Sequence, residues 1–192
     1  DIRERGVRSI ICLGDVGAYG PEPEACLAYV LERCSLIIRG NGDGASEYRR
    51  SGAAGAPTPW PLQVEQGELL FVHGSARDPL REYVFPEDAS NEKKLTDLFR
   101  WIPRLCFQGH THLPGVFTDD FQFATPAELG YRFSFDDRKA MINVGSVGQP
   151  RDGDLRACYV LFDPGASGSP PSIEFRRVEF DVEAARRKPR RR

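Results

Sequence analysis

The chain has 192 residues and a mass of 21.5 kDa, enough for one domain with a buried core. Apolar residues make up 40% and charged residues 28%, a balance typical of soluble proteins. The formal net charge of -2 argues against general binding to nucleic acids or to anionic membrane surfaces, and no apolar run of about 18 residues exists to span a membrane.

The first elements predict a βαβ unit. Val7–Leu13 is β-rich and ends in a continuous apolar run, which is typical of a strand covered on both faces. Pro21 and Pro23 mark the start of a helix, and 35–39 predicts a second strand. Apolar residues recur along this helix with helical spacing: Cys26, Leu27, Val30, Leu31 and Cys34. A strand, a helix and a strand in this order favour a parallel pair.

Further elements follow a connection rich in Gly, Ala and Pro at 51–61. We expect a strand at 68–72, a helix over Asn91–Trp101 with Asn91 as its N-cap, and a buried strand at 105–107. Later strands are predicted at 115–118, 131–135, 140–144, 157–162 and 172–182.

These elements predict one domain over 1–182 and a basic, disordered tail over 183–192. The five cysteines are an odd number and contain no C-x-x-C pair. They indicate small buried thiols in a reducing compartment, so we expect a cytoplasmic protein.

Four of the predicted strands end in a residue that can bind a metal: Asp15, Asn41, His73 and His110. Ligands in α/β sheets gather at the carboxyl ends of strands. Each residue alone has a structural explanation, as a turn residue, a helix cap or a core histidine. Together they form a mixed oxygen and nitrogen set that suits Mn²⁺, Fe or Zn²⁺. His110 and His112, one residue apart, can share a metal or form an ordinary surface turn.

The motifs resemble those of a known family. Gly14-Asp15, Gly40-Asn41-x-Asp43, His73-Gly74 and Gly109-His110-x-His112 are similar, in this order, to the motifs of calcineurin-like metallophosphoesterases, especially the small bacterial phosphodiesterases. The loop from Asn143 to Arg151 also matches, and the resemblance extends from about Val7 to Val182. It implies an α/β fold, a four-layer αββα sandwich of two mixed sheets.

The resemblance also implies roles for the predicted ligands. Asp15 would bridge two metals, Asn41, His73 and His110 would complete one site, and His112 would join the other. Two divalent ions, Mn²⁺, Fe²⁺, Ni²⁺ or Zn²⁺, would support attack of a metal-bound water on a phosphate ester or anhydride. Asp15, Asn41, His73 and His110 would thus form the catalytic centre.

A small phosphorylated substrate would lie beside Gly74, Ser146 and Arg151. The fork of Arg151 suits phosphate oxygens, although an ion pair with the neighbouring Asp152 explains it equally well. No membrane partner is expected, nucleic acid is disfavoured, and an oligomer is compatible with the sequence.

Two departures from the family pattern matter. An Asp-x-His motif on the family's first strand has no counterpart in 1–9, so that strand is expected to be missing. The start without Met, in a last helical turn ended by Gly6, predicts preceding sequence; the alternative is a one-metal derivative. Asp15 and His112 are few ligands for a second ion, so this chain should hold one tightly bound metal or fewer.

The second departure is Gly42, where many relatives have a histidine that assists the leaving group. Its absence favours diesters, activated esters or anhydrides. A catalytically silent interaction module on the same fold, as in the retromer scaffold subunit, is the alternative function. A nucleic-acid role for the C-terminal arginines ranks third.

Overall fold

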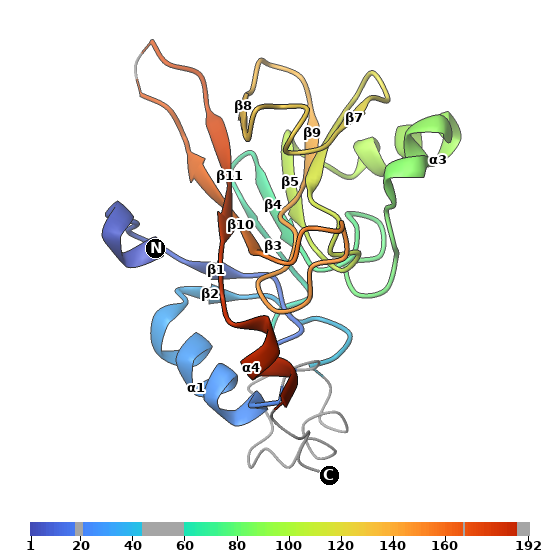
Figure 1. Ribbon diagram of the computed structural model, residues 1–192. Coiled ribbons are helices and arrows are strands. Elements are labelled where there is room, and N and C mark those ends of the chain that lie inside the picture. Colours follow the sequence, from blue (N-terminus) through green and yellow to red (C-terminus); the bar gives the residue numbers. More distant parts are fainter. Residues whose placement is uncertain (18–20, 44–59, 167, 188–192) are drawn as a thin grey trace.

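The computed structural model describes residues 1–17, 21–43, 60–166 and 168–187 (Figure 1). Most of the expected connection at 51–61 and the end of the basic tail, 188–192, lie outside the described residues. Within the described ranges, no helix is long and apolar enough to cross a membrane.

The larger sheet has six strands in the order β3-β4-β5-β9-β6-β7. Its centre is formed by three parallel strands, β4 (Leu69–Val72), β5 (Leu105–Gln108) and β9 (Ala140–Asn143). Antiparallel pairing adds β3 (Gln63–Gln66) beside β4 and β6 (Gly115–Thr118) beside β9, with β7 (Phe123–Ala124) at the edge. The carboxyl ends of the three central strands therefore meet at one edge.

The central strands are apolar up to the last residue of β5, Gln108, and of β9, Asn143, because both of their faces are covered. In β4, Leu70 and Val72 pack in a core cluster with Leu95 of helix α3 (Glu92–Arg100). Phe71, between them, points to the opposite face and stacks on Phe107 of β5. Asn91 caps α3 as expected, since its side chain accepts a hydrogen bond from Lys94 N.

A second layer covers the other face of the large sheet in two pieces. One is an antiparallel sheet in the order β10-β11-β8, formed by β10 (Ala157–Asp163), β11 (Ser172–Val178) and β8 (Arg132–Ser134). The other is a parallel pair of β1 (Ile11–Cys12) and β2 (Leu36–Ile37). Ile38 after β2 and Phe175 of β11 join the same core cluster as Phe71. The architecture is the mixed α/β fold that the sequence predicts, although its second sheet is divided.

Several elements differ in extent from the prediction. Only two residues of 7–13, Ile11 and Cys12, pair in a strand, and their partners are Leu36 and Ile37 of β2. The N-terminal turn is a 3-10 helix, η1 (Ile2–Arg5), ended as expected by Gly6 at φ 65°. A short helix, α4 (Val182–Arg187), begins where a strand was expected to end and includes the start of the predicted tail.

Helix α1 (Pro23–Arg33) starts at the predicted proline but buries less than its sequence suggests. Leu27 and Val30 are half-buried, whereas Cys26 and Leu31 are exposed. Cys26 thus departs from the expected buried thiols, while Cys106 and Cys158 lie in the core. A second 3-10 helix, η2 (Pro86–Ser90), precedes α3 and was not predicted.

Candidate metal centre

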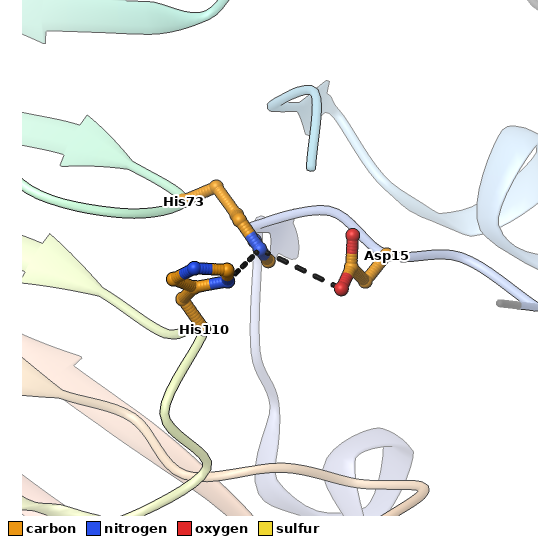
Figure 2. A group of neighbouring side chains, drawn as sticks. All are labelled: Asp15, His73 and His110. Atoms are coloured by element: carbon orange, nitrogen blue, oxygen red, sulfur yellow. Dashed lines mark hydrogen bonds and ion pairs between the residues drawn. The ribbon is translucent and has the colours of Figure 1, made fainter. Parts of the chain in front are cut away.

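Three predicted ligands converge from three elements that are far apart in the sequence. Figure 2 shows Asp15, which follows β1, His73, which follows β4, and His110, which follows β5, pointing toward one another. One ligand atom from each lies within 4.8 Å of the others. His73 Nε2 is 2.9 Å from His110 Nδ1, 3.6 Å from Asp15 Oδ2 and 3.2 Å from Asn41 Oδ1. Asn41, which follows β2, is therefore a fourth member of the cluster.

Backbone carbonyls fix the tautomers of both imidazoles. His73 Nδ1 lies 2.7 Å from the carbonyl oxygen of Leu13, which can only accept, so Nδ1 carries the proton. In the same way, His110 Nε2 donates to the carbonyl oxygen of Arg81 at 3.2 Å. The lone pairs of His73 Nε2 and His110 Nδ1 consequently face each other across 2.9 Å.

With these tautomers, the four atoms that converge are all acceptors. Asp15 Oδ2 is buried and has no hydrogen-bond partner among the described residues, and the amide oxygen of Asn41 is also an acceptor. Four acceptors this close repel one another unless a cation lies among them. Two ligands of one metal, each about 2.1 Å from it, are about 3.0 Å apart in octahedral and about 3.4 Å apart in tetrahedral geometry. The observed separations of 2.9, 3.2 and 3.6 Å fit a shared divalent ion.

Burial favours the neutral forms of His110 and His112 by lowering the pKa of each. Loss of solvation and, next, the neighbouring His73 lower the pKa of His110 from 6.5 to about 4. Burial also lowers the pKa of His112. Neutral imidazoles are the form that binds metals, so both rings are prepared for coordination at neutral pH.

The backbone is strained at three of the predicted ligands. Asp15, His110 and His112 have φ values of 59°, 64° and 62°, in the left-handed region that residues with a side chain rarely adopt. Two other described non-glycine residues share it, Phe121 and Tyr131. Such strain costs about 1–3 kcal/mol per residue and concentrates at functional sites. The strained backbone that holds these three side chains in place therefore lowers the stability of the fold.

Asp43 clamps the two turns that carry Asp15 and Asn41. Its buried carboxylate accepts hydrogen bonds from Asp15 N at 2.7 Å, Val16 N at 2.8 Å and Gly40 N at 2.8 Å. Gly42 N in turn donates to Asp15 Oδ1 at 2.7 Å. Asp43 belongs to the Gly40-Asn41-x-Asp43 motif, but its role was not predictable because a single sequence does not show which backbone groups a carboxylate meets.

Asn143, at the end of β9, supports the histidine loop and was also missed as a functional residue. Its amide nitrogen donates to Gly109 O at 2.7 Å and Thr111 Oγ1 at 2.8 Å, and its amide oxygen accepts from Gly145 N at 3.0 Å. Asn143 is opposite Gln108 in the parallel ladder. The Asn143 side chain thereby fixes the loop after β5, which carries His110.

His112 lies beside the cluster but does not join the group of three. Its Nδ1 donates to Gln149 O at 2.6 Å, which leaves Nε2 as the ligand atom. The charges of Asp15 and His73 act on its pKa, so it lies within electrostatic reach of the centre. The two histidines of the motif therefore have different surroundings, and the role of His112 as a ligand of a second metal stays a prediction.

The structure gives local reasons for two of the predicted substrate residues. Gly74 is buried, and a Cβ there would be 2.7 Å from Asp78 O, so the turn itself requires glycine. Ser146 Oγ accepts from Gly148 N at 3.3 Å and Gln149 N at 3.0 Å, which shapes the loop after β9. Contact of either residue with a substrate remains a prediction.

Arg151 is the third predicted substrate residue. Its backbone N–H donates to His112 O at 3.3 Å, and its guanidinium donates to Gln149 Oε1 at 3.0 Å. Asp152, the alternative partner, forms its ion pair with Arg177 instead. Arg151 is therefore tied to the backbone of His112 while its side chain is exposed.

Comparison with known proteins finds a family model, a relative and a solved structure that are similar to this chain. Residues 1–166 match the family model of the calcineurin-like phosphoesterase superfamily domain. The "Uncharacterized protein MJ0912" of Methanocaldococcus jannaschii is 30% identical over 96% of this chain and 82% of its own length. A crystal structure of a metallophosphoesterase from Sphaerobacter thermophilus superposes with a TM-score of 0.83 at 28% identity, covering 97% of this chain and 84% of that one.

A more distant structure shares the fold alone. The hypothetical protein PH1004 from Pyrococcus horikoshii OT3 has a TM-score of 0.61 at 14% identity, over 96% of this chain and 81% of its own. The arrangement of sheets described above is thus shared by proteins of widely different sequence.

Proposed function

Because the chain belongs to the calcineurin-like phosphoesterase superfamily, we propose that it is a metal-dependent phosphoesterase that hydrolyses a small phosphate ester or anhydride. The observation that carries the proposal is the cluster of four acceptor atoms on Asp15, Asn41, His73 and His110, which includes a buried carboxylate oxygen without a hydrogen-bond partner among the described residues. With both imidazoles neutral, one divalent cation satisfies all four acceptors at once.

The residues around the centre have separate tasks. Asp15, Asn41, His73 and His110 would hold one ion, of which Mn²⁺, Fe²⁺, Ni²⁺ and Zn²⁺ are candidates. A divalent metal supplies Lewis-acid chemistry, polarising phosphoryl oxygens and lowering the pKa of water. Asp15 provides the negative charge, and the carbonyls of Leu13 and Arg81 keep the imidazole lone pairs directed inward.

In the hydrolysis, the oxygen of water bonds to phosphorus as the bond from phosphorus to the leaving oxygen breaks. Arg151, whose backbone N–H donates to His112 O, would bind a phosphate oxygen. With Gly42 in the place of a histidine, all three histidines of the chain are already assigned to metal ligation. The leaving oxygen would take its proton from solvent, which favours diesters, activated esters or anhydrides.

Turnover of bis-(p-nitrophenyl) phosphate in the presence of Mn²⁺ or Ni²⁺ tests this function. We expect hydrolysis that a chelator abolishes and that His73→Ala lowers by at least about a hundredfold, since losing a ligand should cost no less than losing its outer-shell support. Asn91→Ala, which removes the N-cap of helix α3 and changes none of the four predicted ligands, is the matched control and should retain turnover.

A protein that binds the metal tightly but hydrolyses no phosphate ester would contradict the enzymatic function. That result would instead favour the alternative, a catalytically silent interaction module on the same fold.

A further inference from the structure

Two exposed aromatic rings lie next to the candidate metal centre. Tyr83 is 43% and Phe85 42% exposed, whereas Val84 between them is 2% exposed and packs in the core cluster beneath α3. The alternation of an extended segment thus directs both rings outward. Lys94 Nζ donates to Tyr83 O at 2.8 Å, and Phe85 N donates to Asp88 Oδ2 at 2.8 Å, so the backbone that presents the rings is anchored at two points.

The rings form one stack that begins at a predicted metal ligand. Tyr83 stacks on the imidazole of His110 with ring centroids 3.8 Å apart and an interplanar angle of 24°. Tyr83 and Phe85 are stacked at 5.4 Å and are nearly parallel, at 4°. The three rings therefore form a stack that runs from His110 through Tyr83 to Phe85, and we call these last two residues the aromatic platform.

We propose that the aromatic platform binds a planar aromatic group, a nucleobase or an aryl ring, of a phosphodiester substrate whose phosphate lies at the metal centre. This inference rests on the proposed function and specifies its substrate class. Because their backbone is anchored, the half-exposed rings offer a planar apolar face that needs little further ordering to bind a ligand. Any nucleobase can stack on such a face, since every base has a planar π-face. The stack on His110 connects this face to the centre that would bind the phosphate.

Three p-nitrophenyl diesters test the platform while keeping one leaving group. The second substituent on phosphorus is 5′-thymidyl, phenyl or ethyl, so differences in kcat/KM report binding of that substituent and not leaving-group chemistry. We expect the thymidyl and phenyl esters to exceed the ethyl ester, and Phe85→Leu to lower that preference about tenfold, as the loss of one stacking ring does. A preference confined to the thymidyl ester assigns the platform to nucleobases, and a preference for both assigns it to planar rings in general.

Trp101→Leu is the matched control. Trp101 is 61% exposed and follows α3, before the chain enters β5 at the end opposite His110. Its replacement should leave the preference unchanged. Equal kcat/KM for all three esters in the natural protein, or the same preference in the Phe85→Leu variant, would overturn the proposal.

Failure of the proposed function gives a different result, namely no turnover of any ester. In that case, ligand binding measured by NMR titration tests the aromatic platform. Adenosine 5′-monophosphate should bind about tenfold more tightly than ribose 5-phosphate in the presence of Mn²⁺. Phe85→Leu should remove that difference. Equal affinity of the natural protein for the two ligands would refute the platform independently of catalysis.

Discussion

At the scale of single residues, Gly40 shows how closely the turns beneath the metal centre are packed. A Cβ at Gly40 would be 2.2 Å from Asp15 Oδ1, whereas one at Gly109 would meet nothing within 4 Å. We predict that Gly40→Ala displaces Asp15 and weakens Mn²⁺ binding at least about tenfold, with a loss of stability of about 1–3 kcal/mol from overpacking.

Gly109→Ala is the control, and titration calorimetry with urea unfolding measures both effects. Equal metal affinity in the two variants would show that the contact between Gly40 and Asp15 does not position the carboxylate.

Asp154 provides a test of electrostatics outside the centre. Hydrogen bonds from the Arg156 guanidinium, with help from the charge of Arg177, lower the pKa of Asp154 from 3.8 to about 2. A carboxylate with a lowered pKa stabilises the fold above its unfolded pKa, and the contribution is lost as the pH falls through about 4 toward about 2. With the side chain 27% exposed, we expect Asp154→Asn to cost about 1–2 kcal/mol at pH 7 and about half of that at pH 3.

Urea unfolding at the two pH values measures the difference. Asp137→Asn, at a fully exposed side chain, should have little effect at either pH. A cost of Asp154→Asn that does not change between pH 7 and pH 3 would contradict the assigned ion pairs.

At the scale of elements, the end of β9 supports the loop after β5. Asn143→Ala removes three hydrogen bonds to the histidine loop and its neighbour. We predict that it lowers Mn²⁺ affinity by about 10- to 100-fold, because outer-shell contacts orient metal ligands. Asn91→Ala at the start of α3 is the matched control, with a loss of about 1 kcal/mol in stability and unchanged Mn²⁺ affinity. If the two variants bound the metal equally well, Asn143 would have no role in orienting His110.

The elements that the sequence predicts best are those whose burial is strongest. β4, β5 and β9 are mostly apolar because both faces are covered, and α3 combines a cap with an apolar face. The edge strand β3, in contrast, is largely polar and exposed, so its pattern resembles a loop. Its hairpin with β4 depends on a turn in which Gly67 has φ 60°. A single glycine in the sequence is not enough to predict such a turn.

At the scale of the whole molecule, the sheet explains why ligands distant in sequence were predictable while their supports were not. Parallel central strands bring His73 and His110 to one edge, and the β1–β2 pair brings Asp15 and Asn41 against it. The carboxyl ends of the predicted strands were therefore enough to identify the four candidate metal ligands. The clamp by Asp43 and the stack of Tyr83 on His110 arise from contacts between separate loops, for which strand patterns hold no information.

The most direct test of the central claim is anomalous diffraction from crystals of the protein loaded with Mn²⁺. Four converging acceptors predict one strong peak about 2.0–2.3 Å from Asp15 Oδ2, Asn41 Oδ1, His73 Nε2 and His110 Nδ1. No peak among these atoms, or two equally strong ions there and at His112, would contradict the account of a centre built to hold one metal tightly.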